Sequence, residues 1–449
     1  MEENNKQDLK KLTFMQYFLV GGSVFAMHFG GSSMLWPMTW GKESGNRVFL
    51  AFSGVFITAL FLVFIAYLSL IKSKRTILSM ASQVSHKYSM IFGITVVLVL
   101  GPLFSIPRMS AAAWDALLQV FKFQPKNIIP ALIFTVIYYL ITYWFISEKG
   151  GILDKLSKIL LPVLIVSVVA IIIKGIITPL GPQVNPVYEA NPFAYGFKGG
   201  YATGDVLCAL VFGGIIIDDL KYKGIGRKYL NKNTIIVCAI GIGLLTLTHF
   251  GHMIVGSHAS TIGNLKYSAL YSEVVLRLWG QVGGVVFNIA LLFAALTTAV
   301  GLGAGTANLF CEVLENRVSY KKATAYILVM SAIISIIGLN SIVEIIGPLM
   351  DVVYPSAVVM ILYYTIMPDL ESKPKILAGY KTGTTTALVY GVLEGIVTYG
   401  NLLNFNVSWL ENIILMIPGS SLNIGWVVVV IVASVIAMLL HRDKKVSTT

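Results

Sequence analysis

The sequence predicts an all-α, polytopic membrane protein with about twelve transmembrane helices, and three observations support this fold class. Hydrophobic residues make up 56% of the 449 residues, and charged residues make up only 12%. The mean hydropathy is +0.79. Apolar stretches of about 18 residues or more, which are typical of helices that cross a bilayer, recur along the chain. Because no polar stretch is long enough to form a soluble core, we expect a single transmembrane domain over residues 1–449.

The apolar stretches predict where the spans lie, and the charges predict their orientation. Most of the 33 Lys and Arg residues lie in alternate connecting segments, as expected of cytoplasmic loops. This pattern predicts cytoplasmic N- and C-termini. It also assigns the net charge of +12 to the membrane surface, so we expect no nucleic-acid partner. In chain order, the expected spans are 14–40, 47–71, 91–121, 128–146, 156–178, 198–217, 233–256, 282–312, 322–338, 343–367, 380–400 and 423–441.

The first span, 14–40, has small residues at its middle, where a simple membrane anchor has Leu or Val. Glycine costs a helix interior about 1 kcal/mol relative to alanine. Irregular backbone inside a membrane persists only beside a cavity or other protein. The pattern therefore favours a helix that is broken at the bilayer midplane and presents backbone groups to a ligand. The alternative is a small-residue face that packs closely on a neighbouring helix. The residues concerned are Gly30, Gly31, Ser32 and Ser33, which follow Phe29.

The sixth span, 198–217, is interrupted in a similar way, by Gly199, Gly200 and Gly204 beside an acidic residue, Asp205. If the chain consists of two five-helix halves, the first and sixth spans occupy corresponding positions. Interruptions at corresponding positions indicate the binding site of a transporter. We therefore expect a five-plus-five inverted repeat with halves at 14–178 and 198–367, followed by two additional spans within 380–441, with broken helices 1 and 6.

The third span, 91–121, contains Arg108 near its middle and Asp115 two helical turns later on the same face. An arginine in a membrane helix costs about 2.5–3.5 kcal/mol on insertion scales and normally faces the protein interior. We expect these two residues to form either a gate element or a structural ion pair.

The eighth span, 282–312, contains two adjacent threonines, Thr297 and Thr298. Threonine hydroxyls in membrane helices either bond back to a carbonyl one turn earlier or serve as oxygen ligands for a small cation. The amphipathic stretch before this span, Tyr267–Arg277, is expected either to cover the outer mouth as a lid or to lie in the membrane interface.

Four segments together resemble the bacterial branched-chain amino acid:cation symporter family, the BrnQ-type carriers of the leucine–isoleucine–valine uptake system. The Gly-Pro-Leu-Phe-x-x-Pro-Arg motif is the most specific of them. The resemblance covers nearly the whole chain and implies the leucine-transporter fold, in which spans 1 and 6 unwind around the substrate. The matching segments are Phe29–Pro37, Gly101–Arg108, Gly200–Asp205 continuing into Val211–Gly213, and Leu296–Leu302.

The resemblance also implies the residues of the site. By analogy, a sodium ion would be held by Ala26, Phe29, Ala294, Thr297 and Thr298. The substrate would contact Phe29, Gly30, Gly31, Ser32, Ser33, Tyr201, Thr203, Asp205 and Leu207, with its carboxylate on the amides of Gly30 to Ser33. This chain departs from the family at one place, because Ser33 stands where the family usually has Asn.

The resemblance implies a secondary active transporter that imports leucine, isoleucine or valine by sodium symport with alternating access, in a bacterial inner membrane. The expected partners are the amino acid, the sodium ion and the lipid bilayer, with no cofactor and no obligate protein partner. No catalytic motif is present, so we expect no enzymatic activity. Three alternatives remain open: a proton-coupled carrier, suggested by His28 in the broken span; a carrier of another small apolar amino acid; and a membrane sensor that binds an amino acid without moving it.

Overall fold

The structure is a computed structural model that describes residues 10–147, 161–188 and 191–441, apart from the side chain of Ser32. Every regular element in these ranges is helical, which confirms the all-α prediction. In the first half the helices are α1 Phe14–His28, α2 Gly31–Ser44, α3 Val48–Phe56, α4 Leu62–Ser73, α5 Ile77–Ser82, α6 His86–Leu98, α7 Ser105–Phe121, α8 Ile129–Ile146 and α10 Leu161–Ile177. In the second half they are α11 Pro192–Tyr201, α12 Asp205–Tyr222, α13 Leu230–Ser257, α14 Tyr267–Val313, α15 Tyr320–Ser335, α16 Leu339–Ser341, α17 Pro348–Ile366, α18 Pro374–Leu402, α19 Ser408–Leu415 and α20 Gly425–Leu440.

The apolar character of these helices makes the chain a multi-pass membrane protein. Among the described residues, six helices are long and apolar enough to cross a bilayer, or up to eight if each of two bent pairs forms one span. Large apolar side chains are exposed on outer helices such as α8 and α20, where lipid would cover them. The count of twelve spans stays a prediction. The predicted span 156–178 begins outside the described residues, and its visible part is α10.

Three of the predicted spans are interrupted. In the first, α1 ends at His28 and α2 begins at Gly31. In the sixth, α11 and α12 meet at 40°. The third was expected over 91–121, and it is interrupted as well. A π-helical turn and a non-helical Gly101 (φ −87°, ψ −113°) separate α6 from α7. Gly101 is followed by Pro102, which lacks an amide hydrogen and so weakens the helix at this point.

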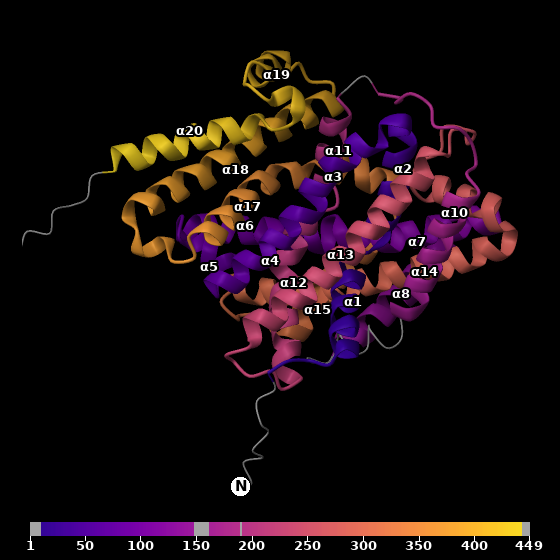
Figure 1. Ribbon diagram of the computed structural model, residues 1–449, viewed down its shortest axis with the longest axis horizontal. Helices are drawn as coiled ribbons and strands as arrows, with labels where there is room; N and C mark the ends of the chain where they lie inside the picture. Colours follow the sequence, from indigo (N-terminus) through magenta and orange to yellow (C-terminus); the bar gives the residue numbers. More distant parts are fainter. Residues whose placement is uncertain (1–9, 148–160, 189–190, 442–449) are drawn as a thin grey trace, which may run out of the picture.

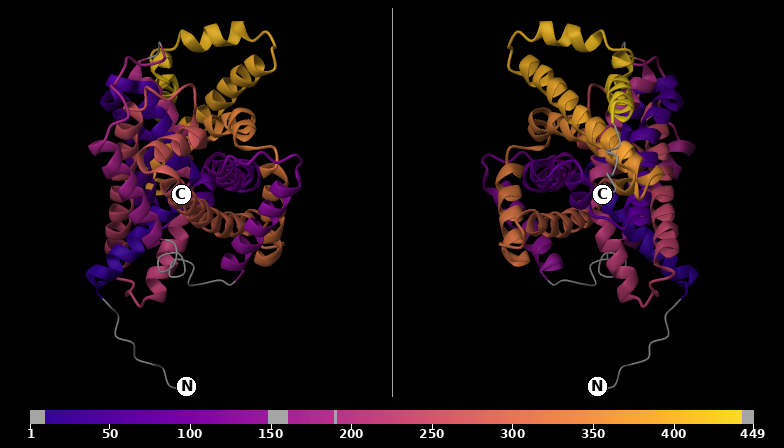
Figure 2. Two further views of the ribbon diagram at one scale, coloured as in Figure 1. Left: turned by 90° about the vertical axis from the view of Figure 1, so that its right-hand side faces the viewer. Right: turned by 90° about the vertical axis from the view of Figure 1, so that its left-hand side faces the viewer.

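The interrupted helices meet at the centre of the bundle. The long helix α14 packs along α7, α2, α1 and α12, and α13 packs on α1 and α2. The last two long helices, α18 and α20, run side by side along one edge of the molecule, with α17 on the inner side of α18 (Figure 1). Figure 2 shows the segment from α18 to α20 at the edge of the bundle. The centre of the fold is therefore formed by helices whose backbone is broken.

Candidate functional site

The first break exposes the amino-terminal end of α2 to the protein interior. Phe29 leaves the helical conformation (φ −79°, ψ 61°), and Gly30 is extended (φ −84°, ψ −172°). The first amides of a helix have no acceptor within the helix. The Gly31 amide instead donates to the Sδ atom of Met109 on α7, at 3.2 Å. Ser33 lies in the same first turn, with its side chain buried. The break thus presents amide donors to the space beside α7.

Gly30 cannot carry a side chain without disturbing this region, although its φ is negative. A Cβ atom at Gly30 would lie 2.6 Å from Thr298 Oγ1 and 2.8 Å from Met109 Sδ. We therefore expect Gly30→Ala to lower any activity that depends on this break by at least about tenfold, since the whole break must shift to make room. The matched control is Gly214→Ala on α12, where a Cβ atom would meet nothing within 4 Å. Uptake or binding by both variants, normalised to membrane abundance, checks the prediction. Equal activity of the two variants would contradict it.

Arg108 forms hydrogen bonds with the backbone at the second break, between α11 and α12. Gly204 has a left-handed conformation (φ 74°) that favours glycine, and it separates α11 from α12. The buried Arg108 donates to the carbonyls of Ala202 and Thr203, both at 2.8 Å. Its guanidinium also lies 4.2 Å from the ring centre of Phe104. Arg108 therefore caps the carboxyl end of α11, where a cation is favoured.

The expected ion pair between Arg108 and Asp115 is not formed. Asp115 instead accepts a hydrogen bond from the Ser268 hydroxyl, at the start of α14. Positions seven apart on a helix are two turns apart, and in this fold each side chain faces a partner on another helix. The spacing in the sequence could not show whether Arg108 and Asp115 would pair with each other or with residues of other helices.

Asp205, the first residue of α12, joins the two breaks. Its Oδ1 atom lies 2.8 Å from Nδ1 of His28, the last residue of α1. The other ring nitrogen of His28 lies 2.7 Å from the Tyr67 hydroxyl on α4. The Oδ2 atom of Asp205 is buried and has no hydrogen-bond partner among the described residues. A carboxylate is favoured at the amino end of a helix. The second break therefore offers one free acidic oxygen.

The two threonines of α14 meet the carbonyl end of α1. Thr297 Oγ1 lies 2.8 Å from the Ala26 carbonyl oxygen and 2.9 Å from that of Ala294. Thr298 Oγ1 lies 2.9 Å from the Met27 carbonyl oxygen and 3.4 Å from that of Ala26. Thr297 thus combines a bond to its own helix with one across to α1, whereas the Thr298 hydroxyl, among the described residues, bonds to α1 alone. These contacts gather several neutral oxygen atoms beside the break.

The other predicted residues are placed less uniformly. The Phe29 carbonyl is not hydrogen-bonded to either threonine in the described part of the chain. Leu207 is buried on α12, two residues after Asp205. Thr203 Oγ1 accepts from the Asp205 amide at 3.2 Å. The Tyr201 hydroxyl accepts from Trp426 Nε1 at 3.0 Å, so it is engaged with α20. The structure therefore brings the glycines, the acid and the threonines together, and directs the Tyr201 hydroxyl elsewhere.

The region around the breaks is covered on one side. The first part of α14, before its kink at Gly280 (φ 63°), lies over the end of α2. There the Tyr267 amide donates to Thr39 Oγ1 at 2.9 Å, and the Tyr267 ring lies 4.6 Å from that of Trp36. The Lys266 ammonium also pairs with Glu43 at 2.7 Å. The stretch Tyr267–Arg277 therefore begins against the end of α2, and its role as a lid stays a prediction.

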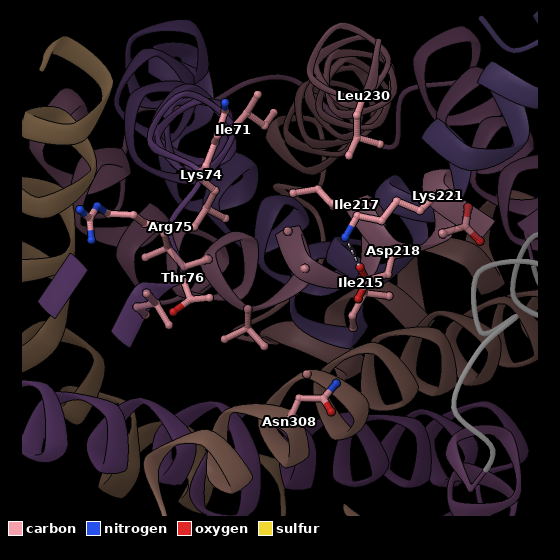
Figure 3. A pocket seen from close by; sticks show the side chains of 18 of the residues that line it. Ile71, Lys74, Arg75, Thr76, Ile215, Ile217, Asp218, Lys221, Leu230 and Asn308 are labelled. Carbon is pink, nitrogen blue, oxygen red and sulfur yellow. Dashed lines mark hydrogen bonds and ion pairs between the residues drawn. The ribbon is translucent and has the colours of Figure 1, made fainter. Parts of the chain in front are cut away.

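The opposite side contains a cavity of about 1300 Å³. Figure 3 shows Lys74 and Arg75 on one wall and Asp218 and Lys221 on another. The cavity extends inward to Leu210 on α12, about one and a half turns beyond Asp205. The start of α13 lines it and lies beside the start of α1, because Asn233 Nδ2 donates to the Lys10 carbonyl at 3.2 Å. The cavity therefore lies on the side of the bundle on which α1 begins.

A comparison with known families places the chain among transporters. A family model described as "Branched-chain amino acid transport protein" matches residues 14–444. The chain belongs to this family. Similar proteins include the branched-chain amino acid permease BraB of Bacillus subtilis, which is 28% identical over 432 residues covering 94% of each chain. Another is the permease BrnQ of Corynebacterium glutamicum, 27% identical over 429 residues and 94% of each chain. This branched-chain amino acid transport protein is accordingly not an enzyme.

Solved structures with a similar fold are also transporters. A manganese transporter of Eremococcus coleocola has a TM-score of 0.57 at 14% identity, covering 96% of this chain and 97% of that one. A Na⁺-coupled sialic acid symporter in an outward-open state has a TM-score of 0.55 at 12% identity, covering 96% of this chain and 91% of the other. At these identities the likeness concerns the fold alone.

Three residues of this branched-chain amino acid transport protein were not anticipated at the site. Met27 contributes a carbonyl next to the threonines, and Met109 contacts the Gly31 amide. Tyr67 is hydrogen-bonded to His28, which in turn is hydrogen-bonded to Asp205. Met109 directly follows Arg108, so the resemblance in that motif pointed to its neighbourhood. Nothing in the sequence indicated Tyr67, because a single tyrosine in an apolar helix is usually a packing residue.

Proposed function

We propose that this protein imports leucine, isoleucine or valine together with sodium, by alternating access. The observation that supports this most is the meeting of the Thr297 and Thr298 hydroxyls with the carbonyl end of α1. It joins a candidate ion site directly to a helix break that offers amides to a carboxylate. Membership of the branched-chain amino acid transport family supports the substrate class.

In this proposal the sodium ion is bound by neutral oxygen atoms. The ligands would be the carbonyls of Ala26, Phe29 and Ala294 and the hydroxyls of Thr297 and Thr298, with Met27 as a further carbonyl. Small alkali cations bind such carbonyl and hydroxyl groups in transport proteins. Because the hydroxyls and carbonyls already lie within hydrogen-bond distance of one another, a modest separation of α1 and α14 would admit the ion.

The substrate would lie between the two breaks. Its carboxylate would accept hydrogen bonds from the first amides of α2, at Gly31 to Ser33, where the helix dipole favours an anion. Its ammonium group would pair with the free Oδ2 atom of Asp205. Its branched side chain would pack on apolar residues nearby, including Leu207 and Phe29.

Asp205→Asn tests the assignment of the ammonium site. The substitution keeps the size of the side chain and removes its charge, so we expect the KM for leucine to rise at least about tenfold, since a charge-assisted bond contributes about 1.5–3 kcal/mol. The control is Asp218→Asn, whose partner is the largely exposed Lys221 at 2.9 Å and whose expected effect is below about twofold. Measured KM values for leucine uptake check both. An unchanged KM in Asp205→Asn would refute the assignment.

Alternating access is supported by the asymmetry of the two sides. The lid of α14 covers the end of α2, whereas the cavity lined by Lys74 and Lys221 opens on the opposite side. We assign the cavity side, which is rich in Lys and Arg, to the cytoplasm of a bacterial cell, together with both termini. The structure would then correspond to an inward-facing state. We further propose that 14–178 and 198–367 are the inverted repeats that exchange between the two states.

The function is tested by uptake of labelled leucine into vesicles reconstituted with the purified protein. We expect accumulation that requires an inward sodium gradient and is inhibited by isoleucine and valine. Replacing sodium by choline at fixed pH distinguishes a proton-coupled carrier, a second candidate favoured by the hydrogen bonds that link Asp205 through His28 to Tyr67. Binding without accumulation in sealed vesicles would instead indicate a sensor.

A further inference from the structure

Two adjacent residues of α7 contact the free backbone groups of both breaks. Arg108 donates to the carbonyls at the end of α11, and Met109 accepts from the Gly31 amide at the start of α2. Met109 is 1% exposed. Its sulfur lies within 2.8 Å of where a Cβ atom of Gly30 would be and within 3.7 Å of where that of Gly31 would be. The sulfur therefore covers both glycines.

We infer that Met109 occupies the subsite of the substrate carboxylate and competes with the substrate for it. This inference rests on the proposed function and adds a residue that sets substrate affinity. A carboxylate cannot reach the Gly31 amide while the sulfur lies there, so binding requires the Met109 side chain to move. Arg108 contacts carbonyls rather than amides and need not move.

The chemistry of methionine suits this role. A buried amide without an acceptor is destabilising, so the Gly31 amide needs a partner whenever no carboxylate is bound to it. A thioether is a weak acceptor, and a carboxylate forms a charge-assisted bond about twice as strong as a neutral one. The unbranched side chain has three rotatable bonds, which allow it to move aside. Met109 can thus accept the Gly31 hydrogen bond and give it up to a carboxylate.

Two substitutions of similar size separate competition from simple packing. Met109→Leu removes the acceptor and nearly conserves volume, whereas Met109→Gln offers a stronger acceptor, an amide carbonyl. We expect the Kd of labelled leucine to fall about threefold in Met109→Leu and to rise about threefold in Met109→Gln. The control is Met253→Leu on α13, a fully buried methionine whose backbone lies against Gly41 near the other end of α2, and it is expected to leave Kd unchanged.

The experiment is equilibrium binding of labelled leucine to the purified full-length protein in lipid nanodiscs at saturating sodium. Opposite shifts in the two Met109 variants support competition. A shift in the same direction in both, or an unchanged Kd in Met109→Leu, overturns it. If Met109→Gln does not reach the membrane, Met109→Leu alone is decisive. A lower Kd then supports competition, and an unchanged or higher Kd overturns it. Absence of leucine binding by the wild-type protein would refute the proposed function rather than the role of Met109.

Discussion

Replacing Thr297 and Thr298 together by alanine is expected to abolish the sodium dependence of leucine uptake. The two hydroxyls lie against the carbonyls of Ala26 and Met27, and their removal takes two of the proposed oxygen ligands from the ion. Each polar contact with a charged group contributes about 1.5–3 kcal/mol, so sodium affinity should fall at least about 100-fold, and uptake should no longer respond to sodium at the concentrations that saturate the wild-type protein. Uptake measured over a series of sodium concentrations at constant ionic strength checks this.

Two further variants show whether the hydroxyls themselves are responsible. Replacing both threonines by serine keeps the oxygen atoms and should retain most of the sodium dependence. Thr306→Ala removes a buried threonine of the same helix whose hydroxyl only bonds back to the Leu302 carbonyl at 2.6 Å. We expect its sodium curve to match that of the wild-type protein. A wild-type sodium curve in the double alanine variant would refute the ion site on α14.

The second large effect is expected from Arg108→Lys. The two guanidinium nitrogens reach two carbonyls at once, those of Ala202 and Thr203, and a lysine ammonium cannot reproduce this planar geometry. Losing one charge-assisted bond leaves the end of α11 without its cap, and the second break should lose its shape. We expect the rate of leucine uptake to fall at least about tenfold, although the charge is conserved.

The matched control is Arg75→Lys. Arg75 forms a single, partly exposed ion pair with Glu371 at 3.1 Å, which a lysine can largely replace. Its uptake should stay within about twofold of wild type. Membrane abundance and thermal unfolding of both variants separate a loss of transport from a loss of folding. Wild-type uptake by Arg108→Lys at normal abundance would show that the cap is dispensable.

The central break could be predicted from the sequence because its signal is local. A glycine pair destabilises a helix regardless of which other helices pack against it, and α1 does end two residues before Gly30. The contacts of Thr297 and Thr298 with α1 were expected only through the family resemblance, since the segments lie 271 residues apart. The break before Ser105 had a local signal in Gly101 and Pro102, but the apolar run around them masked it.

The partners of the charged groups could not be predicted in this way. Arg108 and Asp115 have a spacing that suits one helix face, yet their partners come from α11 and α14. The partner of Asp205 is His28, 177 residues earlier in the chain. Such pairings depend on how helices are placed in space, and one sequence contains no information on which apolar faces meet.

The most direct measurement is the Kd of labelled leucine for the purified protein in sodium and in choline at the same pH. If the two ligands share the break between α1 and α2, each stabilises the other, and the coupling must be reciprocal. We predict a Kd at least about tenfold lower in sodium, and an equal gain in sodium affinity when leucine is bound. Identical Kd values in sodium and choline would contradict the account.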